Sequence, residues 1–170
     1  MSRLIADASA LVSLGIVTDD DPDPLALCLS RYEVVVPTAV IDELQEIASY
    51  DDVHGHAASA VLDRVDSFTT QSVDLDAEFP LDDGENAAIT LANDLDAALF
   101  LCDEFNQLGL IHASLADTRL VTTPTLLSVL VRTEQLSAAD ARLLLDEISD
   151  ARSWGANSYV QRARSLLEEP

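Results

Sequence analysis

Residues 97–103 read Ala-Ala-Leu-Phe-Leu-Cys-Asp, the most hydrophobic strand candidate of the chain, and the run ends on an acidic residue, Asp103. A short, continuous apolar run is typical of a strand buried on both faces, as in a parallel sheet. A second such run, Arg3-Leu4-Ile5-Ala6, also stops at an aspartate, Asp7. In open α/β sheets, ligands bind beyond the carboxyl ends of the strands. Asp7 and Asp103 are therefore candidate ligand-binding residues, although an aspartate at this position can also simply cap the next helix.

The rest of the chain alternates strand-like and helix-like segments. Further strands are expected at residues 34–36, which Pro37 ends, near residues 68–73 and at residues 120–121. Expected helices cover residues 8–16, 24–31, 38–50 (capped by Thr38), 53–66, 82–95 and a short stretch ending near His112, and three more begin at Thr123, Ser137 and Asn157 or Ser158. This alternation predicts an α/β domain with a mostly parallel sheet. We expect residues 1–170 to form a single domain, with residues 123–170 as its helical C-terminal part.

Acidic residues dominate the composition. The 170 residues include 31 Asp and Glu but only 9 basic residues, all of them Arg, for a net charge of −22. This balance argues against a DNA-binding module with a basic surface, but not against a local nucleic-acid site held by metal ions. Acidic surfaces without Lys resemble those of proteins from salt-loving (halophilic) microbes. Because molar salt is needed to screen such repulsion, the composition predicts that the fold is lost at low salt.

Neither a membrane segment nor a secretion signal is evident in the sequence. No apolar run reaches spanning length, and the N-terminus lacks a basic region followed by an apolar one. We therefore expect a cytoplasmic protein with no membrane partner. The two cysteines, Cys28 and Cys102, lie in apolar segments and are expected to be buried free thiols.

Two glutamates fall on the apolar faces of predicted helices. Glu43 lies between Val40 and Ile47 in one apolar stripe, and Glu85 forms an i, i+3, i+4, i+7 set with apolar residues at 88, 89 and 92. A carboxylate on a buried face costs several kcal/mol unless it is paired or binds a cation. Nine arginines are too few to pair most of the acids, so a hard divalent cation, Mg²⁺ or Mn²⁺, is the expected partner.

Structural explanations for both glutamates stay open. Asp82 and Glu85 have the spacing of a capping box, which would make Glu85 a helix-capping residue. Glu43 could lie at the edge of its stripe and face water. His54 and His56 do not share a helix face and have no evident third ligand, so an exposed helix start is expected there rather than a metal site.

Taken in order, four segments of the chain resemble the PIN-domain family, and within it the branch of nucleic-acid-binding proteins related to VapC-type toxins. They are Leu4-Ile5-Ala6-Asp7-Ala8-Ser9-Ala10-Leu11, Val40-Ile41-Asp42-Glu43-Leu44, Asp83-Gly84-Glu85-Asn86-Ala87-Ala88-Ile89 and Leu99-Phe100-Leu101-Cys102-Asp103-Glu104. The resemblance spans nearly the whole chain and includes the helical tail. It implies a three-layer α/β/α fold and a metal-dependent ribonuclease.

The resemblance also implies roles for particular residues. Asp7, Glu43, Glu85 and Asp103 fall on the family's acidic positions and would hold one or two Mg²⁺ or Mn²⁺ ions, Ser9 would support the first aspartate, and Asp82 or Asp83 could replace Glu85 as a ligand. Relatives in this branch often carry Asp-Asp followed by Arg, whereas this chain has Asp103-Glu104-Phe105-Asn106. Arg3, Arg31, Arg64 and Arg119 are candidate phosphate contacts.

Several functions are compatible with these features. The first is a divalent-metal-dependent endoribonuclease with RNA as substrate. A toxin-like role in the sense of the resembling branch, an antitoxin-like protein partner and a homodimer are further expectations. A second is a PIN-fold binding or regulatory module without catalysis, which the net charge favours. A receiver-like phosphotransfer protein ranks last, because the chain has no Lys to contact the phosphate.

Overall fold

A parallel sheet organises the molecule. In a computed structural model that describes residues 1–75 and 77–168, the strands are β1 (Arg3–Ala6), β2 (Glu33–Pro37), β3 (Thr69–Gln71), β4 (Leu99–Leu101) and β5 (Arg119–Val121). All neighbours pair in parallel, in the order β3-β2-β1-β4-β5. The chain runs outward from β1 in both directions, so the point where the strand order reverses lies between β1 and β4, beside Asp7 and Asp103.

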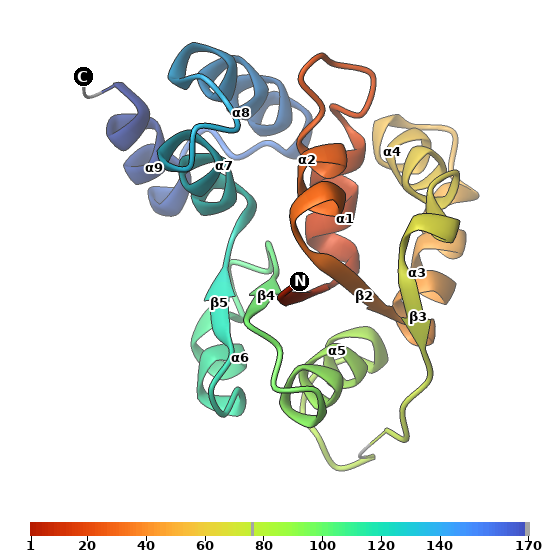
Figure 1. Cartoon of the computed structure of the whole chain (residues 1–170). Helices are drawn as coiled ribbons and strands as arrows, with labels where there is room; N and C mark the ends of the chain where they lie inside the picture. The colour runs from red at the N-terminus through yellow and green to blue at the C-terminus, as the bar shows by residue number, and fades with distance from the viewer. Residues whose placement is uncertain (76, 169–170) are drawn as a thin grey trace.

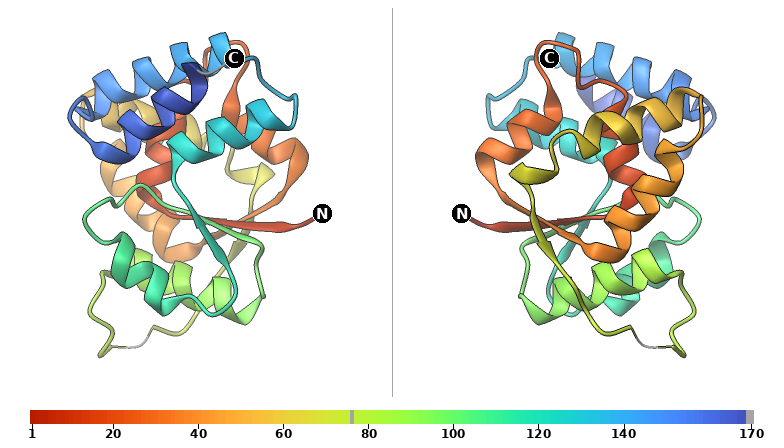
Figure 2. Two further views of the ribbon diagram at one scale, coloured as in Figure 1. Left: turned by 90° about the vertical axis from the view of Figure 1, so that its left-hand side faces the viewer. Right: turned by 90° about the vertical axis from the view of Figure 1, so that its right-hand side faces the viewer.

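Helices cover both faces of the sheet, as Figures 1 and 2 show. They are α1 (Ala8–Gly15), α2 (Pro24–Arg31), α3 (Thr38–Ala48), α4 (Val53–Leu62), α5 (Asp83–Asp94), α6 (Leu108–Ser114), α7 (Thr123–Arg132), α8 (Ala138–Arg152) and α9 (Ser158–Glu168). Helices α5 and α6 lie on one side of the sheet, and α1, α2 and the C-terminal helices lie on the other (Figure 2). The three-layer α/β/α architecture expected from the sequence is confirmed.

Alternate residues of the central strands feed two hydrophobic cores. Leu4 and Ala6 of β1 belong to the larger core, shared with α1 and the C-terminal helices, whereas Ile5 points to the smaller core under α5. This two-residue period is what a strand buried on both faces requires. The sheet therefore fixes the position of its carboxyl edge from both sides.

Three local features differ from the sequence prediction. Thr38 is the first residue of helix α3 rather than its cap, and the N-cap residue, Pro37, has no side-chain oxygen that could cap the helix; the Thr38 hydroxyl shares a 2.9 Å hydrogen bond with that of Ser72. The helix expected over residues 53–66 ends at Leu62 and is followed by a separate 3₁₀ turn, η1 (Val65–Ser67). The strands expected near residues 68–73 and at residues 97–102 are shorter than predicted, at Thr69–Gln71 and Leu99–Leu101, because Ala97 and Cys102 are buried apolar residues that lie outside β4.

The C-terminal helices α7, α8 and α9 pack on one another and, through α7 and α8, against α1. Both cysteines are free and buried, as predicted. None of the helices described is long and apolar enough to cross a membrane.

Candidate active site

Asp7 follows β1 directly and is held by three donors. Its Oδ1 accepts hydrogen bonds from the Ser9 hydroxyl (2.7 Å) and the Ala10 N–H (3.1 Å), and its Oδ2 accepts one from the Cys102 thiol (2.9 Å). The side chain is only 2% exposed. Burial raises its pKa from 3.8 to about 7, even though these hydrogen bonds act in the opposite direction. Asp7 therefore caps α1 and is also a buried group whose charge is poorly solvated.

Asp103 lies beside Asp7 at the end of β4. Thr123 donates to both of its carboxylate oxygens, from the backbone N–H (2.7 Å) and from the hydroxyl (2.6 Å). The Asp103 N–H in turn donates to the Ser9 hydroxyl (2.9 Å), so Ser9 links the two strand-end aspartates. Burial raises the pKa of Asp103 despite the Thr123 bonds. The Ser13 side chain acts on Asp103 in the same direction as Thr123, by lowering its pKa.

Glu43 reaches from α3 to the start of α5. A β-carbon added at Gly84 would lie 2.5 Å from Glu43 Oε2 and 3.7 Å from Asp82 Oδ1. Only a glycine lets the Glu43 carboxylate come this close to the N-terminus of α5, where the helix dipole favours negative charge. The side chain is half-buried. The apolar stripe of α3 predicts a buried Glu43 side chain, and this prediction is only partly correct.

Glu85 lies in the first turn of α5 and is 7% exposed. The apolar residues that share its helix face, Ala88, Ile89 and Ala92, are buried with it, as the stripe predicts. The Asp82 side chain accepts from the Glu85 N–H at 2.9 Å, which is one half of the capping box considered above. A capping role for the Glu85 backbone and an inward-facing Glu85 carboxyl therefore coexist.

These carboxylates act on one another. Burial is the main reason that the pKa of Glu85 rises from 4.5 to about 8, and the negative charges of Asp82, Glu104, Asp7 and Glu43 raise it further. Glu43, whose pKa rises from 4.5 to about 7, is affected in the same way by Asp82, Asp7 and Glu104. We call Asp7, Glu43, Asp82, Glu85 and Glu104 the acidic cluster. Mutual repulsion of this kind is what a bound cation would relieve.

The acidic cluster is open rather than closed into a cage. Within the described ranges, no group of three His, Cys, Asp or Glu side chains is placed so that it could hold a metal ion as it stands. The donor set nevertheless suits Mg²⁺ or Mn²⁺, because it consists of carboxylate oxygens only. Glu43 also lines an acidic groove of about 550 Å³ that includes Asp83, an exposed residue at the start of α5.

Glu43 also lines a second cavity, of about 300 Å³. Its walls include Ser9, Glu43 and Glu104, but also His54 and Arg152. We call it the mixed-charge pocket. Negative and positive groups thus face one cavity next to the acidic cluster.

Sequence reasoning missed three of these residues. The negative charge of Glu104 acts on Glu43 and Glu85, and the sequence signal for this residue is its position directly after Asp103. His54 lines the mixed-charge pocket, whereas His56 is exposed and contacts Asp51, so the expected exposed helix start holds only for His56. Arg152 could not be selected from the sequence, because it is 48 positions away from Glu104 in the chain.

The arginines proposed from the sequence lie elsewhere. Arg3 pairs with Glu33, Arg64 pairs with Asp23, and Arg31 lies over the ring of Tyr32. Arg119 is exposed on β5, and none of the four lines the mixed-charge pocket or the acidic groove.

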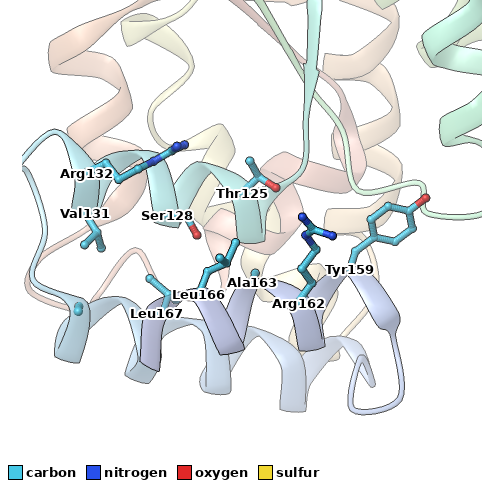
Figure 3. Close-up of a pocket in the computed structure, with 10 residues that line it drawn as sticks. Thr125, Ser128, Val131, Arg132, Tyr159, Arg162, Ala163, Leu166 and Leu167 are labelled. Carbon is cyan, nitrogen blue, oxygen red and sulfur yellow. The ribbon is translucent and has the colours of Figure 1, made fainter. Parts of the chain in front are cut away.

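A third cavity, of about 280 Å³, is separate from the acidic residues. It lies between α7 and α9, where Arg132 and Arg162 approach it together with Tyr159, as Figure 3 shows. No Asp or Glu is among its lining residues. Tyr159 is half exposed and stacks on Phe105, whereas Trp154 is buried.

Comparison with known proteins agrees with this arrangement. No curated protein matches the chain. A family model described as a PIN domain matches residues 3–169, which is nearly the full length. This match supports a nuclease-type fold. The chain therefore belongs to the PIN-domain family.

Proposed function

We propose that the chain is an endoribonuclease that depends on Mg²⁺ or Mn²⁺ and hydrolyses RNA phosphodiester bonds. The observation that carries this proposal is the acidic cluster: three of its carboxyl groups, Asp7, Glu43 and Glu85, are buried or half-buried and have raised pKa values. PIN-domain membership supports a nuclease, and the oxygen-only donors support a hard cation.

Asp7, Glu43, Glu85 and Asp103 would hold the cation, with Glu104 as a further carboxylate facing the cluster. When bound, the metal would lower the pKa of a water molecule and neutralise charge on the phosphate under attack. Ser9 would keep Asp7 and Asp103 in register, because its hydroxyl contacts both residues. Thr123 would hold Asp103 against the start of α7. In-line displacement by water would leave a 3′-hydroxyl and a 5′-phosphate.

The finer expectations from the resemblance belong to the same proposal. A toxin-like role would require an antitoxin-like protein partner. A homodimer would have to use a surface other than the apolar faces of α7 and α8, because Leu127, Leu130 and Leu145 are buried in the chain's own core. Neither is needed for the chemistry proposed here, so the nuclease activity can be tested on the isolated chain.

The experiment is a cleavage assay on labelled single-stranded RNA with Mn²⁺, Mg²⁺ or EDTA, at high salt. We expect cleavage by the wild type with either metal and none in EDTA. Asp7→Asn, Glu43→Gln and Glu85→Gln should each abolish it. Asp117→Asn, which makes the same chemical change at an exposed position before β5, should cleave like the wild type.

Two results would reject the nuclease proposal. One is wild-type rates for both Asp7→Asn and Glu85→Gln. The other is a wild-type protein that Mn²⁺ stabilises against heat but that leaves RNA intact, since metal bound only to the native state raises the melting temperature without any chemistry. That second result would instead identify a catalytically silent PIN-fold binding module.

A further inference from the structure

One wall of the mixed-charge pocket carries groups that a metal site does not need. Glu43 and Glu104 face this pocket from the acidic cluster, and Arg152 and His54 line it from α8 and α4. In a chain with only nine basic residues, an arginine beside the acidic cluster calls for an explanation. A pocket with these groups suits an anionic ligand that also binds a metal cation.

Arg152 is held in place by aromatic rings. Its guanidinium carbon lies 5.7 Å from the centre of the Trp154 ring, which is a cation–π distance. Trp154 is 8% exposed and packs edge-on against Phe105, the residue that follows Glu104. Ser153 turns the chain between Arg152 and Trp154 with a φ of 58°. The side chain is therefore anchored beside the strand-end loop by a buried ring.

The charge of Arg152 acts on nearby carboxyl groups, although Arg152 forms no ion pair among the described residues. It lowers the pKa values of Asp103 and Glu104, which burial raises. The ion pairs found among the described residues do not include Arg152. Its five N–H donors thus remain available to a ligand, and a guanidinium fork matches the geometry of a phosphate.

His54 supplies a second donor. Its Nε2 atom is buried and, within the part of the chain that the structure describes, has no hydrogen-bond partner. A buried polar atom without a partner costs free energy, and a ligand atom in the pocket would remove that cost. The volume of the mixed-charge pocket, about 300 Å³, is at the low end for small-molecule sites and is large enough for a ligand to reach His54.

We propose that Arg152 and His54 form a phosphate-binding subsite, which holds a backbone phosphate of single-stranded RNA against the Glu43 and Glu104 side of the acidic cluster. This inference rests on the proposed function for the identity of the ligand. It assigns the contact with the phosphate to Arg152, the last residue of α8. The cation would come from the C-terminal helices instead of the loop after β4.

The test measures binding separately from cleavage. Fluorescence anisotropy of a short labelled single-stranded RNA is recorded in Ca²⁺, which also takes oxygen ligands, for the full chain and for Arg152→Gln, Arg152→Lys, His54→Phe and His54→Gln. Arg162→Gln is the matched control, because it removes the same charge from the C-terminal helices at a residue lining the third cavity (Figure 3). Thermal melts establish that each variant is folded.

We expect Arg152→Gln to weaken binding by about tenfold or more, the loss typical of a charge-assisted hydrogen bond. It should also reduce the slope of log affinity against log salt by about 0.7, the value for one phosphate contact on a single strand. Arg152→Lys should restore the slope but only part of the affinity, because it keeps the charge and loses the fork. His54→Phe should weaken binding, and His54→Gln, which keeps an N–H donor, should weaken it less.

Equal RNA affinity and equal salt slope in Arg152→Gln and Arg162→Gln would overturn the subsite, because any loss of binding would then reflect only the overall charge of the protein. So would a wild type that binds no RNA in Ca²⁺, or full cleavage rates in both Arg152→Gln and His54→Phe. RNA binding that depends on Arg152, in a wild type that does not cleave RNA with Mn²⁺, would support the subsite and reject only the nuclease proposal.

Discussion

Replacing Asp7 by Asn should stabilise the metal-free protein at pH 8. Asp7 is 2% exposed, and burial raises its pKa from 3.8 to about 7. Because the folded-state pKa is the higher one, the associated stability is fully present below about pH 4 and is lost as the pH rises to about 7. A shift of about three units corresponds to about 4 kcal/mol for ionising this one buried carboxyl group.

Asparagine preserves most of the local structure while removing the charge. Its Oδ1 can accept from Ser9 and Ala10 as Asp7 does, so the cap of α1 is kept. The amide NH₂ would face the Cys102 sulfur, a weak acceptor. We therefore expect Asp7→Asn to be more stable than the wild type at pH 8 in EDTA by up to about 4 kcal/mol, or on the order of 10 °C in melting temperature for a chain of this length.

The assay is a series of thermal melts between about pH 4 and pH 8 in EDTA and high salt, with Asp117→Asn as the control for a simple loss of surface charge. The gain from Asp7→Asn should shrink to nothing near pH 4, where the wild-type carboxyl group is protonated in both states. Added Mn²⁺ should stabilise the wild type more as the pH rises, because ligands must be deprotonated, and should stabilise Asp7→Asn little. A variant less stable than the wild type at pH 8, or a gain independent of pH, would refute the reasoning.

Three further predictions follow from single contacts and from the overall charge. Gly84→Ala should reduce RNA cleavage strongly while changing the melting temperature little, because the added β-carbon would lie 2.5 Å from Glu43 Oε2 and would push that carboxylate away. An unchanged kcat/KM would contradict the placement of Glu43. Thr123→Val removes the hydroxyl that donates to Asp103 at 2.6 Å and should lower the free energy of unfolding by about 1.5–3 kcal/mol, measured by urea denaturation; a loss below about 0.5 kcal/mol would show the bond to be unimportant. The melting temperature should rise as KCl increases from about 0.1 M to about 1 M, over which the Debye length falls from about 10 to about 3 Å, and a melting temperature independent of KCl would contradict the salt-dependent fold.

The strand ends and the buried helix faces could be predicted from the sequence because both are local patterns. Asp7 and Asp103 each follow an apolar run, and the period of α5 places Glu85 on the face that is buried. Glu43 was harder to place. Its inward position depends on the absence of a β-carbon at Gly84, on a different helix, and no spacing within α3 encodes that contact.

Arg152 and His54 could not be predicted for a related reason. Both belong to helix ends far from the strand-end motifs in sequence, and only the packing of α8 and α4 brings them to one pocket with Glu43. The partner of Arg64 is equally non-local: it pairs with Asp23, which lies 41 positions earlier in the chain. Charge counting showed that cations are scarce, but which of them lies beside the acids is a property of the tertiary structure.

The uneven distribution of charge would reconcile an acidic chain with the proposed RNA substrate. Residues 1–122 contain 24 Asp and Glu against 4 Arg, whereas residues 123–170 contain 7 against 5. The sheet and its first helices therefore repel RNA except where a divalent cation neutralises the acidic cluster, and the helices that follow Thr123 are close to neutral. A strand of RNA would thus meet the least repulsion along the C-terminal helices, the side from which Arg152 reaches the pocket. The cation would neutralise the acids that hold it, and the C-terminal helices would supply the approach; neither alone would bring a phosphate to the carboxyl edge of the sheet.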